Sequence, residues 1–176
     1  MKTGLAALLA VAAAGMIVAG QSSVDPKLLA QLKRLFPSAT SFSPKEGDPP
    51  HFKAYVNEPQ SGARQVAGFA FWTTDLEPLE RGYDGPIKIL VGLDTAGILT
   101  GIIVVDHHEP YGSFSVDPPE FAAQFKGKNI RDPFKVGEDI DAVSRASMSI
   151  LSATRAVKNS ARRLAKQLLA PPSPAK

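Results

Sequence analysis

The sequence of 176 residues contains no cysteine. This absence excludes a disulfide framework, cysteine-ligated zinc, an iron–sulfur cluster, a thiol nucleophile and a CxxCH haem attachment. Any redox chemistry must therefore use another cofactor. Charged residues make up 21% of the chain and hydrophobic residues 44%, which excludes a wholly disordered or fibrous chain and suits one compact domain.

Charge is nearly absent from the first stretch of the chain, where Lys2 is the only charged side chain up to Gly20. The apolar run 5–19 ends in small residues and is followed by polar ones, which is the layout of a secretory signal. We expect residues 1–20 to be a signal peptide, cleaved after Ala19 or Gly20. The alternative is an uncleaved N-terminal anchor, because about 17 weakly charged residues approach the length of a membrane span. Both alternatives imply export to the periplasm or another extracytoplasmic space.

Acidic residues are absent from Ala142 to Lys176. This segment carries a charge of +7 from Arg145, Arg155, Lys158, Arg162, Arg163, Lys166 and Lys176. Residues 21–141 carry a charge of −5 from 12 basic and 17 acidic groups. A basic segment is typical of binding to nucleic acid or to an anionic membrane surface, but export argues against nucleic acid and we predict no nucleic-acid partner. The segment fits either a solvated basic face on an amphipathic helix or an anion bound near its start.

Three segments carry helix signals. The first has Asp25 as N-cap, Pro26 at the first helical position and leucines at helical spacing up to Pro37. The other two are a short helix capped by Asp117 that ends near Phe125 and a long amphipathic helix at about 147–169.

The segments between the helices carry strand signals. Strands are predicted at 52–56, 66–74, 87–91 and 98–105, the last two joined as a hairpin by the turn at 94–97. Residues 38–50 are predicted to be a loop, 132–139 a strand or an extended loop, and 170–176 a disordered tail after a domain at 21–169. This order predicts an α+β fold, in which a mainly antiparallel sheet is packed by an N-terminal helix, a short helix and a long C-terminal helix.

The run Asp106-His107-His108-Glu109 suggests a metal site at first sight. Adjacent residues of an extended strand point to opposite faces, so His107 and His108 do not readily bind one ion together. The only other histidine is His51. We therefore predict no metal, and the alternatives are a loop that lines a ligand cleft and plain surface polarity.

The stretch from Asp139 to Ser149 ends where the long helix is expected to begin. Small hydroxyl residues before an apolar stripe are by default helix caps. A helix N-terminus with free N–H groups is also a site for anions, and Arg145 can add a charge-assisted hydrogen bond to a phosphate. The residues alone leave both interpretations open.

Several short pieces of the chain share their order and spacing with one family. They are Gly82–Ile87, Val91–Asp94, Gly101-Ile102 leading to His108-Glu109-Pro110, Gln124–Gly127 and Asp141–Ser147. On these pieces the chain resembles the FMN-binding domain family of the periplasmic flavoprotein subunits of the Rnf and sodium-pumping NADH:quinone oxidoreductase complexes. It is similar in particular to the N-terminal domain of the nitrous-oxide-reduction protein NosR. The resemblance covers most of the chain from Leu35 to Leu169.

The resemblance implies FMN as the cofactor and a motif that carries it covalently. In the family, Asp-x-x-Ser/Thr-Gly-Ala-Thr holds FMN as a phosphoester on its last hydroxyl. Asp141, Ser144 and Ala146 match this motif by position, and Ser147 becomes the acceptor. Arg145 stands where glycine is usual and Ser147 where threonine is usual. Covalent FMN on Ser147, noncovalent FMN and loss of FMN are the three alternatives.

Arg145 carries alternatives of its own. If the family's glycine serves a backbone with positive φ, arginine strains or reshapes this loop. It can equally bind the phosphate. A phosphate at the start of the long helix would also account for the +7 segment.

The resemblance also suggests where the isoalloxazine ring would lie. The candidates are the turn with Tyr83, Gly85, Pro86 and Ile87 and the loop from His108 and Glu109 to Tyr111. For the turn glycines and Pro86, ordinary turn chemistry is the alternative.

The function that the resemblance implies is electron transfer by an exported flavoprotein, a carrier more than a self-sufficient enzyme. It would pass electrons between a membrane redox partner, such as a respiratory complex, and an extracytoplasmic acceptor. An exported FAD-dependent flavin transferase would be needed for maturation. The alternative is an FMN-binding-like fold that has lost covalent flavin and serves as a binding or assembly module of a respiratory complex.

Overall fold

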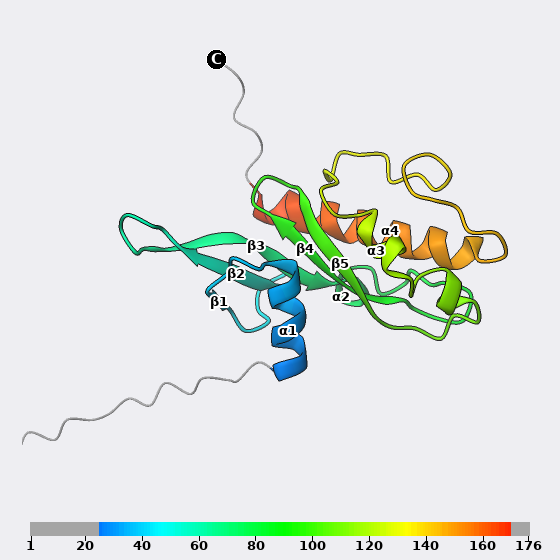
Figure 1. Ribbon diagram of the computed structural model, residues 1–176, viewed down its shortest axis with the longest axis horizontal. Helices are drawn as coiled ribbons and strands as arrows, with labels where there is room; N and C mark the ends of the chain where they lie inside the picture. The colour runs from blue at the N-terminus through cyan, green and yellow to red at the C-terminus, as the bar shows by residue number, and fades with distance from the viewer. Residues whose placement is uncertain (1–24, 170–176) are drawn as a thin grey trace, which may run out of the picture.

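The computed structural model describes residues 25–169. The predicted signal peptide or anchor at 1–20 and the predicted tail at 170–176 lie outside this range. Within it, the chain forms a five-stranded antiparallel sheet whose strands follow chain order, with helices packed on it (Figure 1). The predicted α+β fold is confirmed.

The sheet and the helices have the following bounds. The strands are β1 (Ser41–Phe42), β2 (Phe52–Asn57), β3 (Arg64–Trp72), β4 (Lys88–Asp94) and β5 (Leu99–Asp106). The helices are α1 (Pro26–Leu35), α2 (Thr73–Leu76), α3 (Pro119–Ala123), α4 (Ser147–Leu168) and the 3-10 helix η1 (Gly112–Phe114). None of the helices in the described range is both long and apolar enough to cross a membrane.

The two faces of the sheet bury different cores because side chains alternate along each strand. In β4, Ile89, Val91 and Leu93 belong to the core beneath α4. Leu90, between them, belongs to the second core with Leu32 of α1. The long helix α4 therefore lies on one face of the sheet, and α1 covers the other.

Close packing of α1 on the sheet depends on two glycines. A Cβ atom on Gly92 would lie 2.2 Å from Oγ1 of Thr100 and 3.1 Å from Cβ of Leu35. A Cβ atom on Gly68 would lie 2.5 Å from the carbonyl oxygen of Leu93 and 2.7 Å from Cε1 of Phe36. The helix can approach the sheet only because these positions carry no side chain.

The predicted helix ends differ in one respect. Asp25 caps α1 as predicted, accepting a hydrogen bond from the N–H of Lys27 at 3.0 Å. Asp117 does not cap α3, whose N-cap is Pro118 without any side-chain hydrogen bond. The Asp117 carboxylate instead accepts a bond from His107 at 2.7 Å.

The predicted loop at 38–50 and the predicted strand at 66–74 need correction, whereas one of the two alternatives for 132–139 is observed. Ser41–Phe42, inside the predicted loop, pairs with β2 because the N–H groups of Thr40 and Ser43 find carbonyl partners there. Thr73 and Thr74 begin α2 and do not extend β3. Residues 132–139 form no strand and remain an extended loop with a single bridge between Val136 and Ile140.

Candidate functional site

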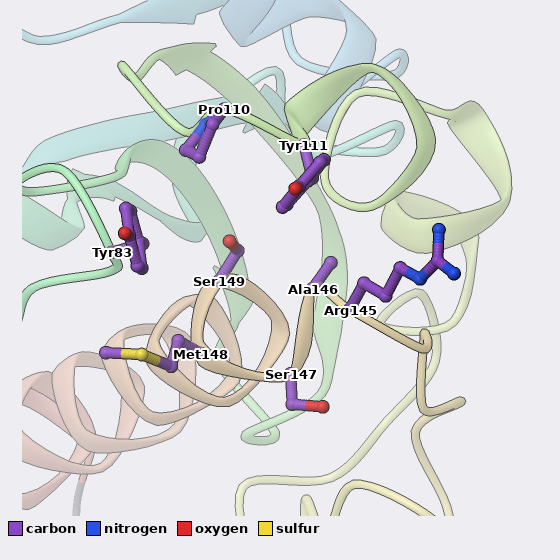
Figure 2. A pocket seen from close by; sticks show the side chains of 8 residues that line it. All are labelled: Tyr83, Pro110, Tyr111, Arg145, Ala146, Ser147, Met148 and Ser149. Carbon is purple, nitrogen blue, oxygen red and sulfur yellow. The ribbon is translucent and has the colours of Figure 1, made fainter.

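A cavity of about 420 Å³ lies where the turn at 82–86, the loop after β5 and the start of α4 meet (Figure 2). Its lining residues come from all three segments. They are Tyr83, Pro110, Tyr111, Arg145, Ala146, Ser147, Met148 and Ser149. In the view of Figure 2, Tyr83 lies to the left of Ser149 and Tyr111 lies above Ala146, with Pro110 at the top between the two tyrosines.

The start of α4 has no side-chain cap. Its N-cap is Ala146, which has no hydroxyl, and the first helical hydrogen bond runs from the N–H of Ile150 to the carbonyl of Ala146 at 3.1 Å. The interpretation of the serines as caps is therefore wrong. The first-turn N–H groups of Ser147, Met148 and Ser149 have no helical acceptor, as at every helix start, and they open beside the cavity.

The turn before α4 places Arg145 in the left-handed region, with φ of 69°. The N–H of Ala146 closes this turn on the carbonyl of Val143 at 3.2 Å. Of the alternatives for Arg145, the strained backbone is therefore observed, since only glycine adopts this conformation without cost. Figure 2 shows its side chain extending away from the tyrosines.

Glu109 holds the three walls of the cavity together from behind. Only 7% exposed, it accepts hydrogen bonds from the N–H groups of Tyr83 and Asp84, each at 3.0 Å. The hydroxyl of Ser149 in α4 donates a third bond to the same carboxylate. Because Glu109 follows β5, one buried carboxylate ties the strand end, the turn and the helix start together.

This carboxylate stays ionised at neutral pH. Burial by itself raises the pKa of Glu109, but the hydrogen bonds from Ser149, Tyr83 and Asp84 outweigh burial and bring the pKa below its usual value. The turn approaches the carboxylate closely because Gly82 has no side chain. A Cβ atom there would lie 2.4 Å from Oε1 of Glu109.

His107 supports the same loop. The N–H of Glu109 donates to its Nδ1 at 3.1 Å, so the ring proton lies on Nε2, which donates to Asp117 at 2.7 Å. A Cβ atom on Gly112 would lie 2.1 Å from Cε1 of His107. The histidine therefore braces the loop, and within residues 25–169 there is no cluster of three or more His, Cys, Asp or Glu side chains suited to a metal ion.

The structure brings some of the predicted site residues to the cavity and leaves others outside. Four of them line it: Tyr83, Arg145, Ala146 and Ser147. Seven do not: Gly85, Pro86, Ile87, His108, Glu109, Asp141 and Ser144. His108 points to solvent while Glu109 lies behind the wall. Met148 and Ser149 were not singled out in the sequence, although their positions in the first helical turn after Ser147 could have indicated them.

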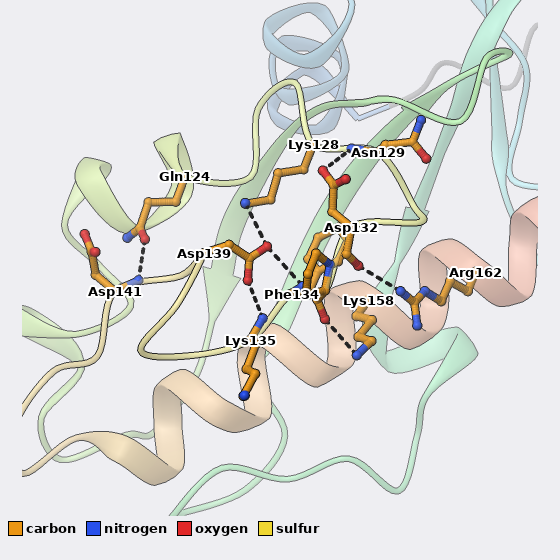
Figure 3. Close-up of polar contacts among 11 residues, drawn as sticks. Gln124, Lys128, Asn129, Asp132, Phe134, Lys135, Asp139, Asp141, Lys158 and Arg162 are labelled. Carbon is orange, nitrogen blue, oxygen red and sulfur yellow. Dashed lines mark hydrogen bonds and ion pairs between the residues drawn. The ribbon is translucent and has the colours of Figure 1, made fainter.

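Asp141 lies on the approach to α4. Its N–H donates to Oε1 of Gln124 at 2.6 Å, and its carboxylate is exposed (Figure 3). This contact joins two of the pieces that carried the family resemblance, Gln124–Gly127 and Asp141–Ser147. Asp141 therefore fixes the path of the chain into the turn at 144–145.

Asp139 organises the neighbouring loop in the same region of Figure 3. It accepts bonds from Nζ of Lys128 and the N–H of Phe134, both at 3.1 Å, and from the N–H of Lys135. Burial alone would raise the pKa of Asp139, but the contacts with Lys135, Lys128 and Phe134 bring it below the usual value.

Most basic residues of α4 bind the body of the protein. Arg155 and Arg163 form ion pairs with Glu80 at 2.8 Å and Glu77 at 3.0 Å. Lys158 and Arg162 donate to carbonyl groups of the loop at 130–133 (Figure 3). The explanation of the +7 segment by a phosphate is wrong for these four residues, because among the basic residues at 142–169 only Arg145 lies at the helix start.

Comparison with known proteins agrees with this geometry. Residues 82–162 match the family model described as an FMN-binding domain. The match contains the turn at 82–86, the loop after β5 and the start of α4, which form the cavity walls. The resemblance found in the sequence is thus confirmed over this range, and FMN is the cofactor that the domain indicates.

One curated relative belongs to the ion-translocating oxidoreductase complex of Vibrio vulnificus (strain YJ016), of which it is one subunit. It is 31% identical over 88 residues, which cover 44% of this chain and 42% of that protein. The aligned region therefore spans less than half the length of this relative.

Proposed function

We propose that this chain is an exported electron-transfer protein that carries FMN as a phosphoester on Ser147. The observation that supports this most is the position of Ser147. Its side chain is exposed, lies in the first turn of α4 and lines the cavity inside the range matched by the FMN-binding domain. The proposed acceptor residue thus lies both at the helix N-terminus and at the cavity.

The residues at the cavity fit FMN. A volume of about 420 Å³ lies within the range of small-molecule sites. Uncapped N–H groups at the start of α4 suit a phosphate, because the positive end of the helix dipole also lies there. The side chains of Tyr83, Tyr111 and Met148 offer the apolar contacts that a planar ring requires.

The phosphoester would form on Oγ of Ser147. The oxygen of the hydroxyl would bond to the FMN phosphorus of FAD while the bond from that phosphorus to the bridging pyrophosphate oxygen breaks. AMP would leave with the bridging oxygen, and the hydroxyl proton would pass to solvent. A separate Mg²⁺-dependent transferase is required for this step. The exposed position of Ser147 supports access by such an enzyme.

When bound, FMN supplies the redox chemistry, and the protein positions it. Glu109 keeps the turn and the helix start in register around the cavity. We propose that the chain is a carrier and not a self-sufficient enzyme, in which no residue acts as acid, base or nucleophile on a substrate.

The relative and the N-terminal sequence support a proposal for the partners and the location. The relative is named as a subunit of an ion-translocating oxidoreductase complex, which supports a membrane redox complex as one partner. The apolar segment at 1–20 supports export, either by signal cleavage or as an anchor. The domain at 21–169 would then exchange electrons with an extracytoplasmic acceptor.

The test compares serine variants purified from the native host. Ser147→Ala is expected to abolish flavin fluorescence of the denatured protein in a gel and to remove the added FMN mass, whereas Ser147→Thr keeps both. Ser144→Ala is the control, because Ser144 is exposed nearby but does not line the cavity. Fluorescence that persists in Ser147→Ala would move the attachment elsewhere.

The second candidate function is a binding or assembly module that has lost covalent flavin. The left-handed Arg145 is the observation in its favour, because it marks a departure from the family motif at the attachment loop. Native protein without any flavin absorbance would favour this function over electron transfer.

A further inference from the structure

Large hydrophobic side chains are exposed at seven positions in the described residues, and six of them lie in the segments that supply the cavity walls or next to these segments in the chain. The six are Leu79, Tyr83, Tyr111, Phe114, Met148 and Leu151, whereas Leu29 lies on α1 at the other face of the sheet. Monomeric proteins rarely gather exposed apolar side chains in one place unless that surface binds something.

Three of the six do not line the cavity, and we call them the outer patch. They are Leu79, Phe114 and Leu151, which are 90%, 47% and 40% exposed. A ligand in the cavity would contact Tyr83, Tyr111 and Met148 but leave the outer patch in water. We therefore expect the outer patch to bind a partner other than the cofactor.

The outer patch borders the cavity on two sides. The Phe114 ring packs on Tyr111 with ring centroids 5.3 Å apart. Leu151 follows Met148 by one helical turn and so lies on the same face of α4. Leu79 is followed by Glu80, which forms an ion pair with Arg155. Arg155 lies one turn after Leu151 in α4, so this ion pair brings the chain at Leu79 to the same part of the helix.

The charge around the outer patch indicates which kind of surface it binds. The segments 78–86, 106–120 and 141–149, which contain the cavity-lining residues, hold five exposed carboxylates and two exposed arginines. Their two other acidic residues do not count toward the surface charge, because Glu109 is buried and Glu80 is paired with Arg155. Exposed carboxylates among them include Asp84, Glu120 and Asp141. An anionic membrane surface would be repelled, and so would a second copy that presents the same surface. A basic surface would be attracted.

We propose that the outer patch docks a protein whose contact surface has an apolar centre surrounded by Lys and Arg. This inference rests on the proposed function in one respect, because such a partner would exchange electrons with the cofactor in the adjacent cavity. Leu79, Phe114 and Leu151 form the apolar contact, and Asp84 and Glu120 belong to its acidic rim.

The experiment places a benzophenone photocrosslinker in the full chain in its native host, in turn instead of Leu79, Phe114, Leu151 or Leu29. Leu29 is the matched control, because it is 41% exposed and lies on the opposite face. We expect one protein to be crosslinked at the three patch positions at least about fivefold more than at Leu29, since binding energy concentrates in a central apolar cluster. The crosslinked peptide of that protein is expected to be rich in Lys and Arg.

Charge reversal tests the acidic rim separately. Asp84→Lys with Glu120→Lys is expected to reduce crosslinking at Phe114 about tenfold, whereas Glu58→Lys in the distant β2–β3 hairpin leaves it unchanged. Crosslinks to lipid, to a second copy, equally at Leu29 or not at all would overturn the proposal. So would a partner peptide without basic residues.

Flavin content is measured in the same samples. Crosslinking in protein without flavin would overturn the proposed function and leave the docking surface in place. Flavin on Ser147 without patch crosslinks would overturn the docking surface alone.

Discussion

The hydroxyl of Ser149 donates a hydrogen bond to the buried carboxylate of Glu109 and thereby joins the first turn of α4 to the loop after β5. The same carboxylate accepts the N–H groups of Tyr83 and Asp84. Since these residues belong to the three walls of the cavity, the geometry of the site depends on one side chain that does not line it.

Glu109→Gln is expected to lower the free energy of unfolding by about 1–3 kcal/mol, because the amide nitrogen of glutamine would leave a buried donor without an acceptor. Urea unfolding of the wild type and of Glu109→Gln at neutral pH measures this difference in the free energy of unfolding. Asp106→Asn is the control, since Asp106 ends β5 three residues earlier and is exposed, and it is expected to change stability by less than about 0.5 kcal/mol. Equal effects of the two variants would contradict the role of Glu109.

Gly82→Ala is expected to lower the free energy of unfolding by about 2–3 kcal/mol, because its Cβ would meet Glu109 at 2.4 Å and force the turn away. Gly62→Ala serves as the control. Its Cβ would meet nothing within 4 Å, but its φ of 68° costs about 1 kcal/mol. Thermal and urea unfolding should rank Gly82→Ala as the more destabilising variant; the reverse order would count against the close approach.

Glu80 predicts a pH dependence of stability. The hydrogen bond from Arg155 lowers the pKa of Glu80 below its ordinary value of 4.5. Because the folded pKa lies below the unfolded one, the stabilisation is complete above about pH 4.5 and disappears as pH falls through the folded pKa. Glu80→Gln should therefore lose less unfolding free energy than the wild type between about pH 6 and about pH 3.5. An unchanged difference would show that the ion pair does not contribute.

Arg145→Gly separates the backbone of the turn from the guanidinium. Glycine adopts the φ of 69° without strain, so this variant is expected to raise the free energy of unfolding by about 1 kcal/mol. Arg145→Ala removes the guanidinium but keeps the strain and should leave stability near the wild-type value. Urea unfolding of both variants distinguishes the two effects, and a loss of stability in Arg145→Gly would show that the side chain stabilises the turn.

Local signals predicted much of the fold correctly. The Asp25-Pro26 pair and the leucine spacing placed α1, and two apolar runs around the turn at 94–97 placed β4 and β5. Asp117 misled because the same residue type caps helices and binds histidine side chains. Which role it takes depended on His107, ten residues earlier in the chain.

The sequence likewise predicted one part of the candidate site and not another. The motif at 141–147 could be recognised because its residues are consecutive. The left-handed Arg145 was open as an alternative, because glycine at the corresponding family position suggested a positive φ. The bond from Ser149 to Glu109 spans 40 residues, and no local pattern indicates it.

The sequence by itself determined the order of the elements, the absence of cysteine chemistry and the likeness to an FMN-binding domain, because these depend on composition, periodicity and consecutive motifs. Tertiary structure decided which partners the basic residues of α4 and the buried carboxylate of Glu109 bind. Arg155 and Arg163 bind Glu80 and Glu77, and Glu109 ties three segments into one cavity. Partners of this kind are chosen by the packing of the folded chain, since residues far apart in sequence meet only when the sheet and α4 bury their common core.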